Sequence, residues 1–301
     1  MPRIKDACAD RDTEREGDWS TIAVSRSGGR SRLTSCRCAA PLKILNPRLD
    51  APYCTAILSS YGGGLVAGDK VYLQICCGAG ATLFLGTQAF TKVYKSPAAS
   101  GSSQQLDATI GPGGCVVAFP DPVVPYADST FHQEQRWELE ENALLILVDG
   151  STAGRLERGE RFHYNSYASD IAVSCQGQQV LVERLLVQPD KFAPQRTGAF
   201  GEFTASMNLY VVGYPDEARF ALIRTYLEAQ LQSQVQAQLQ SPWARDKICN
   251  TLISFAQPRP QVFVARALGR TTAALNDLVD LVGAAVAAPE ILGENPRRRK
   301  Y

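Results

Sequence analysis

The side chains of this chain that could do chemistry are mainly carboxylates, because histidine is scarce. Among 301 residues there are 30 Asp and Glu but only two histidines, His132 and His163. No Gly-x-Ser-x-Gly sequence, the mark of a hydrolase nucleophile, occurs in the chain. The chain therefore has few histidines from which to build a catalytic base or a zinc site of histidine and carboxylate. The available chemistry is acid–base work by carboxylates or the binding of hard cations.

Asp69 ends the most glycine-rich stretch of the chain. Gly63 and Gly68 have the spacing of a phosphate-binding loop, but Asp69 stands at the position of the phosphate-binding Lys. The residues that follow, Lys70–Cys77, are strand-like and do not open a helix, so we predict no nucleotide site. The simpler interpretation is a tight turn between two strands, which Gly63, Gly64 and Gly68 permit.

Other carboxylates interrupt or end apolar segments. Asp149 ends an apolar strand, and Glu183 lies inside the apolar run Val180–Val187. An ionised carboxylate in such a strand is costly unless it is paired or lines water. One interpretation is structural ion pairs, for which the sequence offers Arg155, Arg158 and Arg184. The other is an internal polar path whose oxygen ligands hold a divalent cation weakly.

A proline-rich segment surrounds Asp121. Pro120, Pro122 and Pro125 fix φ and remove three backbone donors within six residues, which excludes a central strand. We predict a rigid loop here, which suits a surface presented to a protein partner better than an active site.

The nine cysteines are scattered, without Cys-x-x-Cys modules. A disulfide framework is not expected, and buried or reduced thiols are the favoured interpretation. Two close pairs, Cys36 with Cys38 and Cys76 with Cys77, leave open a soft-metal site, since alternation in a strand would put Cys36 and Cys38 on one face.

Composition places the chain among ordinary globular proteins. It is 45% hydrophobic and 20% charged, and its net charge of +1 gives no electrostatic footprint for nucleic acid. No apolar run reaches the ~18 residues that a membrane-spanning helix needs. Residues 1–20 are highly charged, unlike a signal peptide, so the cytosol is the expected compartment.

The elements that must position these residues are mostly strands. Residues 1–20 read as a disordered leader, 21–290 as one domain with a β-rich body (21–214) and a helical part (215–290), and 291–301 as a basic tail. The fold class expected is mainly β, with short strands in stacked or layered sheets, as in a sandwich, barrel or irregular solenoid. The predicted strands are Thr21–Ser25, Ser31–Cys38, Tyr53–Leu58, Lys70–Cys77, Thr82–Gly86, Ser103–Ile110, Cys115–Phe119, Thr130–Leu139, Leu144–Val148, Asp170–Cys175, Gln178–Val187, Ser206–Val211 and Val262–Leu268. Helices are predicted after Pro215, over Trp243–Phe255 and over Thr271–Ala288.

Four segments in register resemble the UreD (UreH) family of urease accessory proteins. They are Gly63–Asp69, Thr87–Tyr94, Phe119–Tyr126 and Gly154–Glu160, and the resemblance extends over about residues 28–290. The chain departs from the usual family pattern at Ala67, Gly86 and Phe90, but at no charged motif residue.

This resemblance implies a non-catalytic scaffold for urease maturation. Its implied partners are UreF, UreG through UreF, and the urease apoprotein, in a dimer of heterodimers with UreF. The implied cargo is Ni²⁺, held weakly by Asp69, Asp149, Glu160 and Glu183 along an internal path, with Thr91 a lesser candidate. The remaining motif residues are expected to be partner-binding or structural: Gly63, Gly64, Gly68, Thr91, Lys92, Tyr94, Pro120, Asp121, Pro122, Pro125, Arg155 and Arg158.

Two other functions remain open from the residues alone. One is a β-rich hydrolase that uses Asp69 or Asp121 as acid or base across a ligand cleft. The other is a plain interaction module without metal transit.

Overall fold

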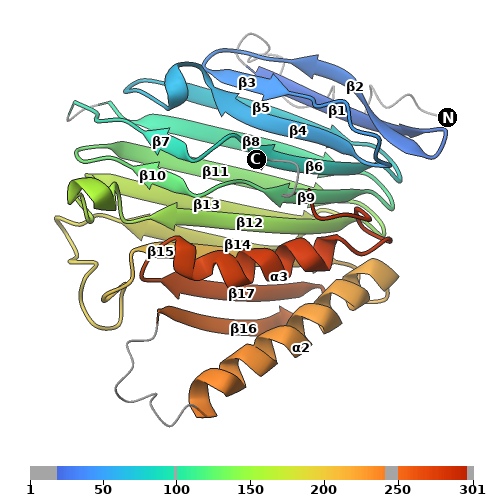
Figure 1. Cartoon of the computed structure of the whole chain (residues 1–301). Helices are drawn as coiled ribbons and strands as arrows, with labels where there is room; N and C mark the ends of the chain where they lie inside the picture. The colour runs from blue at the N-terminus through green and yellow to red at the C-terminus, as the bar shows by residue number, and fades with distance from the viewer. Residues whose placement is uncertain (1–18, 98–99, 241–249, 297–301) are drawn as a thin grey trace.

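The computed structural model of the chain describes residues 19–97, 100–240 and 250–296. Most of them belong to two stacked sheets (Figure 1). The first sheet, with seven strands, has the order β14 (Gln178–Val187), β13 (Ser166–Cys175), β11 (Thr130–Leu139), β8 (Ser102–Ile110), β5 (Lys70–Cys77), β1 (Trp19–Ser27) and β2 (Arg30–Arg37).

The second sheet runs alongside the first and includes two strands from the 215–290 part. Its order is β16 (Thr251–Arg259), β17 (Val262–Gly269), β15 (Ala205–Gly213), β12 (Leu144–Thr152), β9 (Cys115–Phe119), β6 (Thr82–Thr87), β4 (Cys54–Ser60) and β3 (Leu42–Leu45). Two short strands, β7 (Thr91–Val93) and β10 (Val123–Pro125), pair with each other off this path, and β10 also pairs with β12.

Successive strands alternate between the sheets, which gives a solenoid-like stack. The chain passes from β4 to β5, β6, β8, β9, β11, β12 and β13, changing sheet each time. Each strand therefore pairs in parallel with the strand of its own sheet from the preceding coil, as β5 does with β8 and β6 with β9. The expectation of a mainly β fold with layered sheets is confirmed.

Two hydrophobic cores hold the layers together. The first lies between the sheets, because strands such as β5 and β11 alternate buried residues with partly or fully exposed ones and so bury one face only. The second lies between the outer face of the ten-stranded sheet and the helices α2 (Ala218–Gln240) and α3 (Asn276–Val286). Since β12 is covered on both faces, all nine of its residues are buried.

The predicted elements hold except in the C-terminal third. Lys70–Cys77, Cys115–Phe119, Thr130–Leu139 and Gln178–Val187 are strands over the predicted ranges. The helix predicted over Trp243–Phe255 is wrong, because Thr251–Arg259 is strand β16, paired with β17; residues 241–249 lie outside the described part of the chain.

The proline segment lies beside the main path of the ten-stranded sheet. Pro125 ends the short strand β10, at the side of the main sheet path, so the exclusion of a central strand is confirmed although the segment is not all loop.

Most of the predicted leader (residues 1–18) and the end of the predicted tail (297–301) lie outside the described residues.

Most described cysteines are free thiols. Cys54, Cys77 and Cys115 are buried, and burial raises the pKa of Cys54 to about 11 and of the other two to about 12, so none is a thiolate near neutral pH. Cys36 and Cys38 are exposed and free. Cys76 is disulfide-bonded, so the expectation of reduced thiols is wrong at that position.

Candidate functional site

The glycine loop packs against strand β7, so two of the four sequence motifs are in direct contact. The Leu65 amide donates to the Lys92 carbonyl at 2.8 Å, and the Tyr94 amide donates to the Leu65 carbonyl at 2.8 Å. A Cβ on Gly64 would lie 2.6 Å from the Tyr94 ring and 2.8 Å from the Lys92 oxygen, which explains the glycine there. Gly63 and Gly68 have positive φ angles of 76° and 88°.

The other two motifs continue this cluster. Tyr94 meets Tyr126 edge-on at 5.2 Å between ring centroids, and the Arg155 guanidinium lies 3.9 Å from the Tyr126 centroid. Arg155 forms an ion pair with Glu160, which also accepts a 3.1 Å hydrogen bond from the Ala127 amide. The Arg155 hydrogen bond lowers the pKa of Glu160, so this carboxylate is ionised and engaged. The four motifs form one cluster at the β7 and β10 side of the stack (Figure 1).

Asp69 closes the glycine loop locally. Its Oδ2 accepts from the Val66 amide at 2.8 Å, and its own amide donates to the Val66 carbonyl at 3.0 Å. This half-buried carboxylate lines neither of the two pockets described below. Its position favours a turn-forming role, whereas its place in cation transit stays a prediction.

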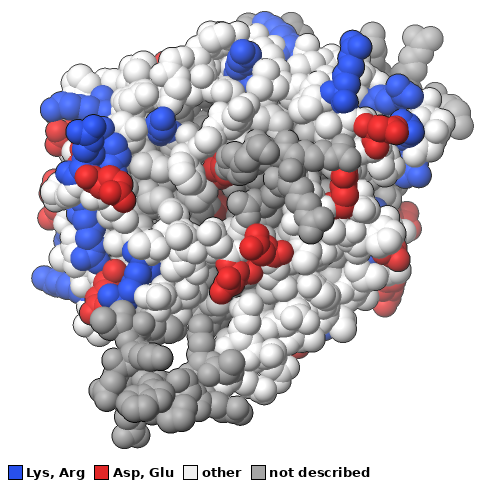
Figure 2. Space-filling model, in the orientation of Figure 1, with Lys and Arg blue, Asp and Glu red and all other residues white. Residues whose placement is uncertain are grey.

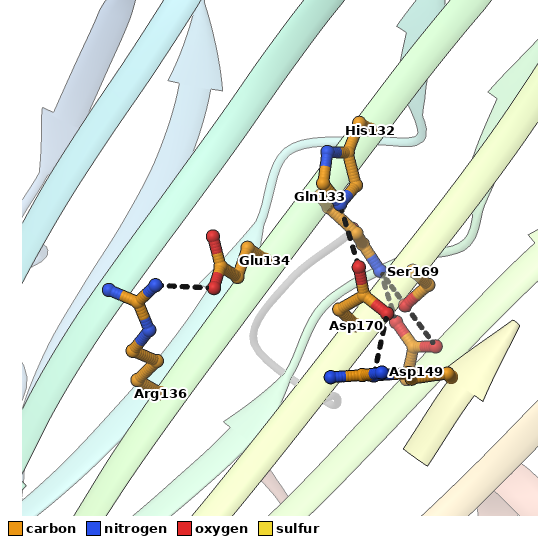
Figure 3. Close-up of polar contacts among 8 residues, drawn as sticks. His132, Gln133, Glu134, Arg136, Asp149, Ser169 and Asp170 are labelled. Atoms are coloured by element: carbon orange, nitrogen blue, oxygen red, sulfur yellow. Dashed lines mark hydrogen bonds and ion pairs between the residues drawn. The ribbon is translucent and has the colours of Figure 1, made fainter. Parts of the chain in front are cut away.

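A cavity of about 80 Å³ lies between the two sheets, with Asp149 in its wall. Gln133 of β11 donates to Asp149 Oδ1 at 2.6 Å and to Ser169 Oγ of β13 at 2.8 Å, and Ser169 donates to Asp149 Oδ2 at 3.2 Å. Figure 3 shows this triangle bridging the sheets, while the neighbouring His132 and Asp170 form a separate pair on the outer face. The cavity is large enough for several water molecules.

Burial dominates the electrostatics of Asp149. It raises the pKa of the carboxyl to about 6, against the opposing hydrogen bonds from Gln133 and Ser169, and the nearby Glu183 charge raises it further. Glu183 projects from β14 and pairs with Arg266 of β17, across the two sheets. Of the other predicted metal ligands, Glu183 lies near enough for its charge to raise the pKa of Asp149, but it does not line the cavity.

A second pocket, of about 230 Å³, opens on the other side of the ten-stranded sheet, next to α3. It shares four lining residues with the cavity of Asp149, namely Phe90, Pro120, Asp121 and Gly150. Asp121 is held at this junction by Thr87, whose hydroxyl accepts from the Asp121 amide at 2.7 Å and donates to its carboxylate at 3.2 Å. Asp121 lines both spaces; the sequence predicted it as a partner-binding or structural residue, or as the acid or base of a hydrolase, but not as part of a cation path.

The predicted ligands do not form a single metal site. No group of three or more His, Cys, Asp and Glu side chains within the described ranges could hold a metal ion. Sequence reasoning missed Gln133 and Ser169, which hold Asp149. A signal for Gln133 was present, because it and Gln135 occupy inward positions of β11 between Phe131 and Trp137.

A family model described as UreD urease accessory protein matches residues 19–301. The chain belongs to the UreD family. A UreD from Cytophaga hutchinsonii is 28% identical over 92% of this chain and 96% of its own length. One from Sorangium cellulosum is 41% identical over 60% of this chain and 57% of its length, and urease accessory protein D of Arabidopsis thaliana is 38% identical over 49% and 52%.

Membership of the UreD family removes one of the functional classes left open by the sequence. UreD is an accessory protein, so the chain is not an enzyme, and the hydrolase using Asp69 or Asp121 is excluded. Among the residues that the structure describes, no helix is both long and apolar enough to cross a membrane.

Proposed function

We propose that this UreD chain is a cytoplasmic scaffold of urease maturation that conducts Ni²⁺ to the urease active site. In this proposal it binds apo-urease and UreF, with UreG recruited through UreF, in a dimer of heterodimers with UreF. The observation that carries the proposal is the buried carboxylate of Asp149 in a cavity of about 80 Å³ that shares Asp121 in its lining with a second pocket.

The donor atoms around this cavity suit a transient cation. Its polar lining is made of oxygen and amide groups, including Thr87, Gln133, Asp121 and Asp149, and neither cysteine nor histidine is among the lining residues. Ni²⁺ stands high in the Irving–Williams order, so thiolate or imidazole ligands would retain it. Carboxylate and amide oxygens instead allow rapid release.

The charge state of Asp149 supports the same role. With a pKa of about 6, the carboxyl is largely ionised at pH 7 and attracts a cation into the cavity. Protonation near pH 6 would remove that attraction. The proposed transit is therefore weaker in mildly acidic conditions.

Partner binding is supported by apolar side chains exposed near the motif cluster. Tyr61, Val66 and Phe90 are 59%, 52% and 43% exposed, and all three lie in or beside the first two motifs. Exposed apolar side chains grouped with polar neighbours are typical of protein interaction surfaces. Lys92 and Arg158 are also exposed there and are offered as polar rim residues.

The test is co-expression of this chain with urease and its accessory proteins, comparing the wild type with the Asp149→Asn and Glu183→Gln variants. We expect both variants to co-purify with UreF and urease but to lower the nickel content and activity of urease. Glu134→Gln, on the outer face of the seven-stranded sheet, is the matched control and should have no effect. Normal nickel loading of urease with both variants would overturn nickel conduction and leave the scaffold role. Failure to co-purify UreF or urease with the wild type would overturn the whole proposal.

A further inference from the structure

Two exposed thiols lie close together at one end of the seven-stranded sheet. Among the described strands β2 is the last of that sheet; Cys36 belongs to it, and Cys38 follows one residue after its end. Both thiols are free and exposed, unlike those of Cys54, Cys77 and Cys115, which are buried. Neither thiol lines the cavity or the pocket described above, so the proposed nickel path makes no use of the pair.

The pairing of β2 with β1 puts the two side chains on one face. Cys36 is opposite the buried Ile22, so it points to the inward side of the sheet. The Ala39 amide donates to Ser20 Oγ at 3.0 Å, so the chain continues along β1 after β2 ends. Alternation then returns Cys38 to the face of Cys36. The two thiols interact, because partial burial raises the pKa of Cys36, and the charge of Cys38 and a hydrogen bond with it raise that pKa further.

The spacing of this pair suits a bridging ion better than a disulfide. Side chains two positions apart in an extended strand are about 6.7 Å apart, whereas a disulfide needs Cβ atoms about 3.8 Å apart. Two thiolate–metal bonds in line, each of about 2.3 Å as for zinc, place the sulfurs about 4.6 Å apart. The two side chains reach that separation by leaning towards each other, without movement of the backbone.

The number of ligands selects the ion. Over the ranges that the structure describes, no group of three or more His, Cys, Asp and Glu side chains could hold a metal ion, so this site has two protein ligands. Structural zinc sites are four-coordinate, and iron–sulfur clusters are held by four cysteines. Cu(I) is a soft cation that thiolates select, and it is stable with two ligands in line.

The charge of β2 suits the complex that would form. Two thiolates and one Cu(I) have a net charge of −1. The strand contains Arg30, Arg32 and Arg37 but no Asp or Glu. Figure 2 shows Lys and Arg side chains along the top of the molecule, at the end of the stack where Figure 1 places β2 and β3. Positive charge at this end stabilises thiolates and an anionic complex.

We propose that Cys36 and Cys38 form a two-coordinate site for Cu(I) at the β2 end of the stack. On binding, each thiol releases its proton to solvent and each sulfur donates an electron pair to the ion, so no atom changes its oxidation state. The site is separate from the cavity of Asp149, whose oxygen and amide groups suit a harder cation. It does not depend on the proposed function.

Anaerobic competition for Cu(I) between the full-length chain and the chelator bicinchoninate tests the site. We expect one Cu(I) to bind per chain. Cys36→Ser and Cys38→Ser should each weaken binding by roughly 100-fold, because the second ligand of the chelate is lost. Cys54→Ser and Cys175→Ser are the matched controls, since each removes a free thiol outside the pair, and both should bind like the wild type.

Three outcomes of this competition would overturn the proposal. The first is wild-type affinity in both Cys36→Ser and Cys38→Ser. The second is an equal loss in Cys54→Ser, which would show a site of three thiols. The third is half a Cu(I) per chain, which would show an ion shared between two copies.

Alkylation of the wild type locates the ion without any substitution. One equivalent of Cu(I) should protect Cys36 and Cys38 from iodoacetamide by at least roughly ten-fold, measured by peptide mass mapping, because a metal-bound sulfur is a poor nucleophile. The labelling of Cys175 should not change. Equal labelling of the pair with and without Cu(I), or protection of other cysteines instead, would contradict the assignment. None of these readouts involves urease, so they are independent of the nickel experiment.

Discussion

Asp149 is a carboxyl group buried between two sheets, and its ionisation is linked to folding. The native pKa is about 6, whereas an Asp in an unfolded chain titrates near 3.9. Between these pH values the native state binds a proton that the unfolded state has lost, so protonation of Asp149 stabilises the fold. As the pH rises through 6 this contribution disappears, and the ionised group costs about 3 kcal/mol at pH 7.

We therefore expect Asp149→Asn to become relatively more stable as the pH rises. The difference in unfolding free energy between variant and wild type should grow by about 2 kcal/mol between pH 4 and pH 7. Asn retains an oxygen for the Gln133 hydrogen bond, and the Ser169 hydroxyl can turn to accept from its amide. Urea unfolding of both proteins at several pH values measures the difference. A difference independent of pH would contradict the raised pKa.

The sequence identifies some residues of this site but not their grouping. Asp149 and Glu183 are visible because a carboxylate stands out in an apolar strand. Their proximity depends on which strands stack, which no local pattern specifies. Asp69 and Glu160 stand in equally suggestive motifs, yet their nearest partners are the Val66 amide and Arg155. A motif therefore predicts that a carboxylate is constrained, but not whether by a turn, an ion pair or a cavity.

An arginine at the start of helix α2 adds polar contacts with the β-stack to the apolar packing of the helix. Arg219 donates to the carbonyls of Asn142 at 2.9 Å and Gly113 at 3.2 Å, both in turns of the stack. It also pairs with Glu217, whose other oxygen accepts from the Phe220 amide at 2.8 Å and caps the helix. The Arg219–Glu217 ion pair thus links the helix cap to the attachment on the stack.

We expect Arg219→Ala to destabilise the protein by about 2–3 kcal/mol, since it removes charge-assisted hydrogen bonds and leaves the negative charge of Glu217 without its ion-pair partner. Hydrogen exchange in the first two turns of α2 should increase at the same time. Arg224→Ala is the matched control, because Arg224 makes an exposed pair with Glu228 worth about 0.5 kcal/mol or less. Urea unfolding measures both losses of stability. Equal losses would show that the hydrogen bonds of Arg219 to the β-stack stabilise the protein no more than an exposed ion pair does.

Elements were predictable where periodicity and length agree. Lys70–Cys77 and Thr130–Leu139 alternate strictly because one face is buried and the other is not. The three-residue strands β7 and β10 escape such reasoning, since they are too short to show a period and are defined by their pairing with other segments. In β16, Ile253 and Phe255 face the core with a period of two, but the short apolar run also fits a helix. Pairing with β17 decides in favour of the strand.

At the scale of the whole molecule, the polar contacts that cross between the sheets include two that act on Asp149. Gln133 and Ser169 of the seven-stranded sheet hold Asp149 of the ten-stranded one, and Glu183 of the former pairs with Arg266 of the latter. The Glu183 charge raises the pKa of Asp149. The sheets are therefore coupled electrostatically through the cavity as well as by apolar packing.

This coupling predicts opposite effects for the two members of the Glu183–Arg266 pair. Glu183→Gln removes a negative charge and should lower the pKa of Asp149, whereas Arg266→Gln leaves that charge uncompensated and should raise it. The measurement is the pH at which the Asp149→Asn stability difference is half developed, determined in each background. Arg136→Gln, which affects a pair with Glu134 on the outer face, should leave that pH unchanged. Shifts in the same direction would mean that Arg266 and Glu183 act on Asp149 only by holding the sheets together, because loss of either partner would then open the cavity to water equally.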